Sequence, residues 1–435
     1  MNLWLFDTLS RSKKSISEEP VITIYLCGPT LYNYLHLGNL RPIVVFDFLI
    51  RYFKIINQPY KYVQNLTDID EKIILKAKHE NKTVKEIVDQ YAESFFNILK
   101  NLNIVWPDQL PAVSTHIKNI QFHIDSLLKQ GKAVWDKKTQ TIRFLNTGKE
   151  KGLNYFSGNE VDEEDSCFAL WKENNHTSYS WESPWFPGIP GWHLECFAMI
   201  EDNFSLPITI HGGGVDLKFP HHENENLLCR FWHNHDLAKV WVHVGQVLNE
   251  AGKLSKSSNY SLAVEECAEQ YSWNFLRYIF MKVRYNKPFM INKEALSSYW
   301  SEWKSYLTAL NYAEITLLNA KHIFFCPEKE LRKIEKPDET IVKHLENDLN
   351  LPELLSWLED LKKTLLNSIK KSDYDNILFY WKKLLTSLEV LGFTLERLSR
   401  ENIDEAERWF DLLSQKNYEE ADKLRLRLTE KGILP

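Results

Sequence analysis

The sequence predicts an α/β Rossmann-like domain that carries an insertion and is followed by an all-α helical bundle in the C-terminal half. In the first half, β-branched strand candidates alternate with apolar helical stretches, which is typical of a parallel α/β sheet. From about residue 262 to the end, Leu, Tyr, Trp, Glu and Lys recur at helical spacing with few helix breakers. The length of 435 residues also exceeds a single core, because domains average roughly 150 residues.

The first strand–helix–strand unit lies near the N-terminus. Residues 21–26 (VITIYL) form a β-branched and aromatic run that ends in a Cys-Gly-Pro-Thr turn. Residues 38–54 are apolar and helical, with Pro42 early enough to lie in the first turn. Residues 60–64 form the next strand, and the polar residues 65–70 follow it. We therefore expect a parallel βαβ unit that binds ligands at its carboxyl edge.

A second α/β portion follows an interruption. Residues from about 110 to 190 are mixed, Trp-rich and polar, and we interpret them as an insertion. Strand candidates return at 208–210 and 240–244, within a segment that runs from 207 to 246.

Composition excludes several classes of protein. No apolar run approaches the ~20 residues of a membrane span, and the N-terminus has an acid within one turn and no basic leader. Six widely scattered cysteines argue against a disulfide-stapled secreted domain and for a reducing cytoplasm. The net charge of −6 gives no sign of a nucleic-acid binder, so any such contact must use local basic stripes.

Four residues form a plausible metal site. Cys27 ends the first strand, Cys196 lies in the segment Gly-Trp-His-Leu-Glu-Cys, and His221 and Glu225 stand four residues apart, on one face if the segment is helical. Two thiolates, an imidazole and a carboxylate suit tetrahedral zinc better than magnesium or calcium. Taken alone, each residue is more often structural, the spacing of a zinc finger is absent, and His193 and His222 are equally good ligands on composition.

Two further segments suit phosphate groups. His36-Leu37-Gly38-Asn39 stands where the first helix begins, so free N–H groups and the helix dipole can meet a phosphate, Gly38 lets the backbone approach, and His36 can donate a hydrogen bond. The segment Lys253-Leu254-Ser255-Lys256-Ser257 offers positive charge to a pyrophosphate leaving group. Each segment alone is a weak signal.

Together these two segments, in this order around an α/β domain, resemble the HIGH and KMSKS signatures of class I aminoacyl-tRNA synthetases. Longer stretches resemble the cysteinyl-tRNA synthetase family over nearly the whole chain: 27–41 (CGPTLYNYLHLGNLR), 65–70 (NLTDID), 183–199 (SPWFPGIPGWHLECFAM), 211–225 (HGGGVDLKFPHHENE), 253–257 (KLSKS) and 348–352 (DLNLP). The block 211–225 is the most specific to this family and its close relatives.

The resemblance implies an ATP-dependent ligase that joins cysteine to tRNA(Cys), with ATP accompanied by Mg²⁺ and one zinc ion per chain. It implies that zinc is held by Cys27, Cys196, His221 and Glu225 and binds the thiolate of the substrate. Implied cysteine-pocket residues are Thr67, Trp192, His211 and Asp216, although Asp216 would equally suit the ATP ribose. Implied ATP contacts are His36, Gly38, Asn39, Gly212, Gly213, Gly214, Lys253 and Lys256, with His36 and Lys256 the catalytic groups. We expect a cytoplasmic monomer.

The resemblance also suggests a division of the chain: a nucleotide-binding catalytic domain in two halves at 1–110 and 196–245, a connective insertion at 111–195, the KMSKS loop and stem-contact region at 246–300, a tRNA-binding helical bundle at 301–400, and shortened anticodon-side helices at 401–435. The insertion is too short for an editing domain. None is needed, because a serine hydroxyl stays protonated and is a poor ligand for a soft metal.

Three departures from the family pattern stand out. Asn39 replaces the usual second His, which predicts altered rather than absent activation, and Leu254 replaces Met, a volume-conserving change. The chain stops at Pro435, where the family usually continues into a short basic tail that helps read the anticodon. Anticodon recognition is therefore the part of the activity that the resemblance supports least.

Two alternatives remain. One is a relative that ligates cysteine to an amino sugar in mycothiol synthesis with the same zinc and ATP chemistry. Residues 348–352 and the helices to 435 favour the tRNA enzyme over it. The other is an inactive paralogue that binds RNA, against which Lys256 and the four intact zinc ligands argue.

Overall fold

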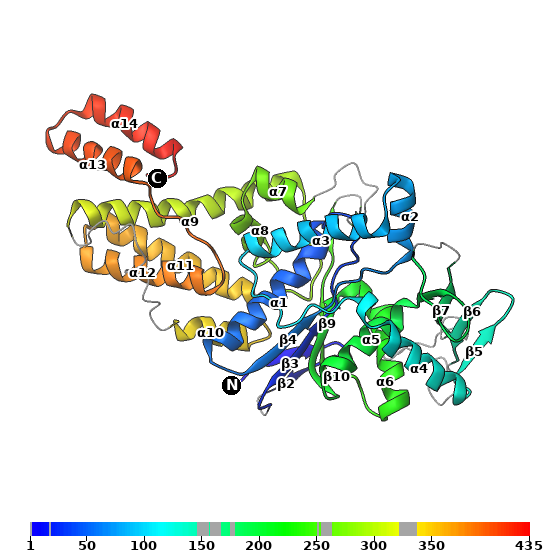
Figure 1. Ribbon diagram of the computed structural model, residues 1–435. Helices are drawn as coiled ribbons and strands as arrows, with labels where there is room; N and C mark the ends of the chain where they lie inside the picture. The colour runs from blue at the N-terminus through cyan, green and yellow to red at the C-terminus, as the bar shows by residue number, and fades with distance from the viewer. Residues whose placement is uncertain are drawn as a thin grey trace.

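The structure is a computed structural model that describes residues 2–16, 19–145, 156, 167–174, 179–249, 252–253, 263–321 and 337–435. Its centre is a four-stranded parallel sheet in the order β10-β9-β3-β4 (Figure 1). The strands are β3 (Ile22–Leu26), β4 (Tyr60–Gln64), β9 (Ile208–Gly214) and β10 (Ala238–Val244). The predicted parallel α/β sheet is confirmed, and its first two strands end where the sequence indicated.

Alternation of side chains along β3 assigns the two faces of the sheet. Ile22, Ile24 and Leu26 belong to the core that contains helix α1 (Leu37–Ile55), whereas Tyr25 belongs to the core on the opposite face. Helix α1 buries 14 of its 19 residues, which explains why its sequence is apolar on every side. Pro42 lies in the second turn of α1 rather than the first, because the helix begins at Leu37.

Helices α5 (Trp192–Asn203) and α6 (Glu223–His233) contribute to the core on the Tyr25 face. Between β9 and α6 the chain passes through two irregular helical turns, Val215–Leu217 and Lys218–His222. Helices α2 (Glu71–Glu80) and α3 (Val84–Asn101) follow β4 and pack against each other.

The N-terminal hairpin extends the core beside β10. Its strands β1 (Trp4–Asp7) and β2 (Ser12–Ser15) are antiparallel. The Thr8 N–H donates to the Trp241 carbonyl over 3.0 Å, and the Asp7 carboxylate accepts from the Trp241 N–H over 2.9 Å. Trp241 of β10 therefore joins the hairpin to the sheet.

The segment predicted as an insertion carries a sheet of its own. A short turn (Val113–Thr115) and helix α4 (Ile117–Lys129) precede four antiparallel strands in the order β5-β6-β7-β8 (Figure 1). They are β5 (Ala133–Asp136), β6 (Thr141–Phe144), β7 (Ala169–Glu173) and β8 (Gly188–Pro190). The chain then enters α5 directly, so this sheet stands next to the start of that helix.

A small three-stranded sheet that the sequence did not predict follows β10. Strand β11 (Val247–Asn249) pairs antiparallel with β12 (Gly252–Lys253) and parallel with β13 (Phe289–Met290). Strand β11 follows the central sheet in the chain, and β13 directly precedes the long helix at Lys293–Asn319.

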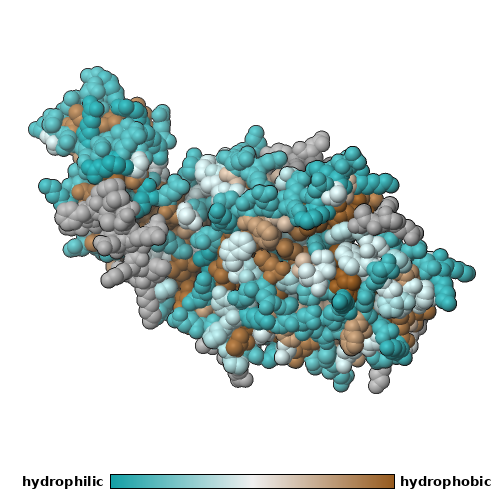
Figure 2. All heavy atoms as spheres, viewed as in Figure 1, coloured by the Kyte–Doolittle hydropathy of each residue, from teal (hydrophilic) through white to brown (hydrophobic). Residues whose placement is uncertain are grey.

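The remaining described chain is almost wholly helical, as predicted. The helices are α7 (Val264–Gln270), α8 (Trp273–Ile279), α9 (Lys293–Asn319), α10 (Glu339–Glu346), α11 (Leu351–Lys370), α12 (Tyr374–Val390), α13 (Arg400–Ser414) and α14 (Tyr418–Glu430). Helices α9, α11 and α12 form a bundle, and α13 and α14 form a hairpin at its far end (Figure 1). Figure 2 shows mostly hydrophilic side chains over the outer surface of this hairpin. None of the helices in the described ranges is long and apolar enough to cross a membrane.

Candidate active site and metal centre

A cavity of about 680 Å³ opens at the carboxyl edge of the central sheet. Its walls come from the residues after β3, the start of α1, the residues after β4, the start of α5, and the turns after β9 and β10. Parallel sheets bind their ligands at this edge, as the sequence led us to expect.

Four potential metal ligands meet beside this cavity, and three of them, Cys27, Cys196 and His221, line it. The ligand atoms of Cys27, Cys196, His221 and Glu225 all lie within 4.8 Å of one another. The two Sγ atoms are 3.8 Å apart, and two sulfurs bound to tetrahedral zinc at ~2.3 Å would stand about 3.8 Å apart. His221 Nε2 lies 2.8 Å from Glu225 Oε1, so the expected placement of these two side chains on one face is confirmed. The donor set and its spacing fit zinc.

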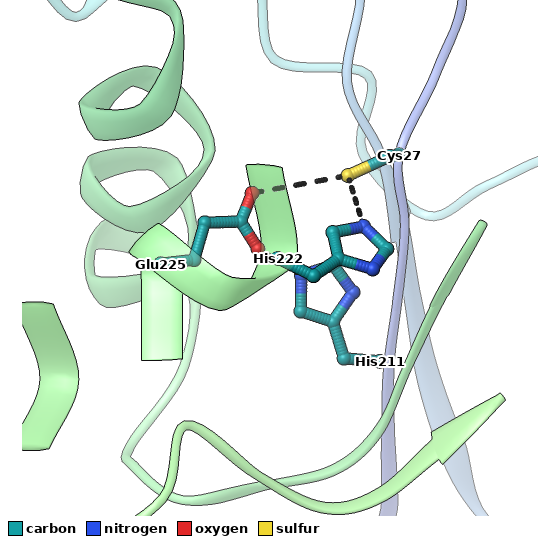
Figure 3. A group of neighbouring side chains, drawn as sticks. All are labelled: Cys27, His211, His222 and Glu225. Atoms are coloured by element: carbon teal, nitrogen blue, oxygen red, sulfur yellow. Dashed lines mark hydrogen bonds and ion pairs between the residues drawn. The ribbon is translucent and has the colours of Figure 1, made fainter. Parts of the chain in front are cut away.

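A second group of four shares two of these residues. Cys27, His211, His222 and Glu225 also bring ligand atoms within 4.8 Å, and Figure 3 shows Glu225 and His222 both directed at the Cys27 sulfur. His222 Nε2 lies 3.3 Å from Cys27 Sγ. However, the described lining of the cavity includes Cys196 and His221 and includes neither His211 nor His222. A metal that binds a substrate must face the cavity, so we favour the group with both cysteines.

Two further histidines contact the potential ligands. His211 Nε2 lies 2.7 Å from Glu225 Oε2, and His193 Nδ1 lies 3.3 Å from His221 Nδ1. Such outer contacts fix the orientation of the groups that bind a metal. The sequence indicated that His211 lines the cysteine pocket. In the structure His211 lies on β9 with its side chain fully buried and is not among the described lining residues of the cavity, so this role stays a prediction.

Charges at this centre are arranged in pairs. Burial alone would lower the pKa of His221, but Glu225 and Cys196 outweigh burial and raise that pKa to about 10. Burial would raise the pKa of Glu225, but His221 and His211 hold it well below its usual range. The Cys27 thiol donates to Cys196 and lowers the pKa of Cys196, whereas burial raises the pKa of Cys27. Cys196 is therefore the first of the two thiols to ionise.

Trp192 and Thr67 both line the cavity, in keeping with a role beside a substrate. The Trp192 indole stacks on His221 at 4.4 Å between ring centroids and leaves 41% of its surface exposed. Thr67 accepts a hydrogen bond from Asn65 Nδ2, and Asn65 Oδ1 accepts from the Gly28 N–H over 2.8 Å. Sequence reasoning missed Asn65, although its position in the polar segment after β4 was a signal.

The start of α1 differs from the expectation of free N–H groups. His36 is the N-cap, and its Nδ1 accepts from the Gly38 N–H at 3.1 Å and the Asn39 N–H at 3.3 Å. Asn39 Oδ1 accepts from the His36 N–H in return. A Cβ on Gly38 would lie 2.9 Å from the His36 ring, so glycine is needed for the cap. Since Nδ1 accepts, the ring proton is assigned to Nε2, and the imidazole becomes the donor at this helix start.

The three glycines after β9 are in different surroundings. A Cβ on Gly212 would lie 2.3 Å from the Phe46 ring, and a Cβ on Gly213 would lie 2.7 Å from Leu217. Both positions are therefore explained by packing, and among the described residues of this trio it is Gly214 that lines the cavity, together with Asp216. Of the predicted signature loop, the backbone of Lys253 lies in β12, while its side chain and Lys256 lie outside the described residues.

Comparisons with known proteins show the family of the chain. The family model "tRNA synthetases class I (C) catalytic domain" matches residues 13–301. A cysteine–tRNA ligase of Mesoplasma florum is 34% identical over 99% of this chain and 100% of its own length. That of Malacoplasma penetrans is 33% identical over the same shares. A solved structure of Mycobacterium tuberculosis methionyl-tRNA synthetase superposes with a TM-score of 0.62 at 13% identity, over 86% of this chain and 90% of that one, which shows the shared fold. The chain belongs to the cysteine–tRNA ligase family of class I aminoacyl-tRNA synthetases.

Proposed function

We propose that this chain activates cysteine with ATP, releases pyrophosphate, and transfers the cysteinyl group to the 3′ adenosine of tRNA(Cys). The observation that carries the proposal is the convergence of Cys27, Cys196, His221 and Glu225 beside a cavity that the first three of them and the His36 helix start line. Membership of the cysteine–tRNA ligase family supports the same activity.

The four potential metal ligands hold zinc in this proposal. A bound zinc ion would bond the substrate sulfur in its thiolate form. Serine cannot form this bond, because its hydroxyl stays protonated and is a poor ligand for a soft metal. A pocket that recognises its substrate by shape alone would discriminate between cysteine and serine by only about 1–3 kcal/mol of binding free energy. His211 and His193 keep Glu225 and His221 oriented toward the cavity.

The first step depends on the positioning of the two substrates and on stabilisation of the charge that develops on the phosphates. The carboxylate of cysteine attacks the α-phosphate of ATP without a general base, because the carboxylate is already ionised. His36 directs its Nε2 proton toward the phosphates, and Lys253 and Lys256, as the family resemblance implies, offset the charge that builds on pyrophosphate. ATP enters as its Mg²⁺ complex.

The remaining cavity residues hold the amino acid. Trp192 covers the His221 side of the cavity, and Thr67 stands beside it on the β4 side. Asp216 lines the cavity and accepts hydrogen bonds either from the substrate ammonium or from the ATP ribose. Gly214 also lines the cavity, where the absence of a side chain leaves room for the nucleotide beside the turn after β9.

The alternatives are not favoured by the comparisons. Cysteine–tRNA ligases match the chain over 99% of its length, including the helices after residue 301. We also propose that the protein works as a monomer in the cytoplasm, where its thiols stay reduced. The cysteines at 27, 167, 196, 229 and 267 are all free.

One pair of assays tests the function. Pyrophosphate exchange is measured with cysteine and with serine, and charging is measured with tRNA(Cys) and with an amino-sugar acceptor. Exchange that depends on cysteine, with serine at least ten-thousand-fold weaker, and charging of tRNA alone are expected. Absence of exchange would indicate the inactive paralogue, and charging of the sugar alone would replace the tRNA assignment.

A further inference from the structure

Among the described residues that line the cavity, Lys72 is the one lysine or arginine, and the proposed mechanism gives it no task. It stands in the first turn of α2, where the Asp70 carboxylate accepts its backbone N–H over 2.7 Å. Its Nζ lies 5.6 Å from the centre of the Tyr32 ring, which also lines the cavity. No carboxylate in the described ranges forms an ion pair with Lys72, and the neighbouring Glu71 pairs with Lys172 instead. The charge of Lys72 is therefore available to an anion that enters the cavity.

A second side chain without a task stands at the opening of the same cavity. Tyr34 lines the cavity and leaves 48% of its surface exposed. Its hydroxyl accepts a hydrogen bond from Gln90 Nε2 over 3.2 Å, and its ring meets the Tyr91 ring edge to face with 5.0 Å between centroids. Both partners belong to α3, so Tyr34 is held in place although nearly half of it is exposed. A fixed and exposed aromatic ring offers a face on which another flat group can stack.

Lys72 stands where the cavity borders on the insertion. It belongs to the helix that follows β4, and β4 is an edge strand of the central sheet. The ion pair between Glu71 and Lys172, at 2.8 Å, joins the start of this helix to β7 of the insertion. The Tyr179 hydroxyl also donates to the Asp68 carbonyl over 2.6 Å, close before the same helix. A large substrate that enters the cavity on this side would pass Lys72.

A cation and a fixed aromatic ring on one cavity suit a single-stranded nucleic acid. Proteins bind such strands with cations that contact the phosphates and with aromatic rings that stack on the bases. The acceptor end of a tRNA is a single strand that ends in CCA, and its last adenosine has to reach the activated amino acid. Because the net charge of −6 gives the protein no general attraction for RNA, local contacts of this kind are needed to hold the strand.

We propose that Tyr34 and Lys72 bind the single-stranded 3′ end of the tRNA, with Tyr34 stacking on one of its bases and Lys72 contacting a phosphate. The proposal rests on the proposed function, which supplies the tRNA. Both residues then serve the transfer of cysteine to the tRNA and not its activation, because activation involves no RNA. Charging and pyrophosphate exchange measure these two steps separately.

Binding of intact and shortened tRNA tests the contact directly. The dissociation constants of tRNA(Cys) and of the same tRNA without its CCA end are measured for wild type, Tyr34→Ala and Lys72→Gln. Loss of one stacked base predicts about tenfold weaker binding of intact tRNA by Tyr34→Ala. Both variants should bind the shortened tRNA as wild type does. A defect that persists without the CCA end, or equal binding of intact tRNA by all three proteins, would overturn the proposal.

Two further measurements separate direct contact from a change in structure. Tyr34→Phe keeps the aromatic ring and loses only the hydrogen bond from Gln90, so it should bind intact tRNA within about threefold of wild type. In Lys72→Gln, the plot of log Kd against log salt concentration should lose about 0.7 of its slope, the value for one phosphate of a single strand. An unchanged slope would overturn the phosphate contact, and a Tyr34→Phe defect as large as that of Tyr34→Ala would overturn the stacking.

Activity assays separate the tRNA from the small substrates. For Tyr34→Ala, we expect kcat/KM for tRNA in charging to fall about tenfold. In pyrophosphate exchange, the KM values of both variants for ATP and cysteine should stay within twofold of wild type. A tenfold rise in either KM would overturn the proposal and assign the residue to that small substrate.

Lys78→Gln is the matched control for Lys72→Gln. Lys78 is an exposed cation on the same helix and is not among the described residues that line the cavity. Its replacement should leave the difference in affinity between intact and shortened tRNA as it is in wild type. A wild-type protein that shows neither exchange nor charging would overturn the proposed function, and the binding comparison would still decide the role of Tyr34 and Lys72.

Discussion

Cys27 and Cys196 reach the metal centre from elements that are 169 residues apart in the chain. In the proposed zinc site thiolates would supply two of the four donors, so Cys196→Ala should leave the protein without stoichiometric zinc and abolish its preference for cysteine over serine. Metal analysis of the purified variant gives the first result and pyrophosphate exchange the second. Cys229→Ala, which removes a buried thiol that belongs to neither group of potential ligands, is the control and should keep its zinc. Full zinc occupancy in Cys196→Ala would contradict the assignment of the centre.

The two overlapping ligand groups make different predictions for adjacent histidines. His221→Ala removes a ligand in the group that faces the cavity, while His222→Ala removes a contact behind Cys27. We expect the first change to weaken zinc binding by well over 100-fold, and the second by the 10- to 100-fold typical of outer contacts. Titration against a competing chelator measures both. The reverse order would place the metal in the group with His211 and His222.

At the scale of single residues, the sequence identified more of the candidate metal site than the spacing of the ligands along the chain could predict. The four-residue spacing predicted that His221 and Glu225 lie together, but nothing in the separation of Cys27 and Cys196 from them predicts the rest of the group, which family resemblance supplied. His211 lies on a buried strand in contact with Glu225, and its place in the cysteine pocket stays a prediction. The roles of Asp216 and Lys256 stay predictions.

The first turn of α1 combines two opposing effects at Gly38. Replacing Gly38 by Ala gains up to about 1 kcal/mol of helix propensity, and displacing the His36 ring loses a cap worth about 0.5–2 kcal/mol. We therefore expect the free energy of unfolding to change by less than about 1 kcal/mol, while the KM for ATP rises several-fold because the imidazole has moved. Denaturant titration and pyrophosphate exchange measure the two. An unchanged KM would show that the His36 cap does not serve ATP.

The N-terminal hairpin depends on one buried carboxylate. Burial alone would raise the pKa of Asp7, but hydrogen bonds from Lys14, Ser10 and Trp241 outweigh it and hold the pKa below 3.8. Since the folded pKa is depressed, Asp7 stabilises the protein above about pH 4 and loses this effect as pH falls through the folded pKa.

Asp7→Asn should therefore cost about 1–3 kcal/mol at pH 7 and progressively less below pH 4. Urea unfolding at several pH values measures the difference from wild type. Asp89→Asn, which removes an exposed carboxylate paired with Lys85, should change little at any pH. If the loss of unfolding free energy in Asp7→Asn did not depend on pH, the effect would come from the shape of the side chain rather than from its charge.

Elements with a strong repeating pattern were predicted well. Strands β3 and β4 and helix α1 agree with the sequence to within one or two residues, because buried parallel strands and a fully buried helix leave long apolar runs. The sheets β5–β8 and β11–β13 were not anticipated. Their strands have two to five residues, too short for an alternating pattern to stand out.

One hydrophobic core joins the catalytic and helical halves of the molecule. It runs from the sheet through α1 to α9, α11 and α12, while α13 and α14 pack around a small core of their own that reaches Ile315. We expect the elements around the larger core to unfold in a single transition. The hairpin of α13 and α14 should open at a lower free energy. Native-state hydrogen exchange should show amides of α13 and α14 exchanging before those of α1. Equal protection in both would indicate a single cooperative unit.

The overall architecture followed from the sequence, but the partner did not follow from its charge. A net charge of −6 gives no sign of a nucleic acid, and only the family resemblance introduced tRNA. The division into domains stays a prediction, because the shared core crosses its proposed boundaries.

Strand β3 has consequences for synthesis of the protein. It lies between β4 and β9, and β9 begins 186 residues after β3, at Ile208 against Ile22. A ribosome that adds 5–20 residues per second needs roughly 10–40 s to supply that neighbour. During this time the nascent chain carries an unpaired, strongly apolar strand edge, which makes it a natural client for chaperones that bind growing polypeptides.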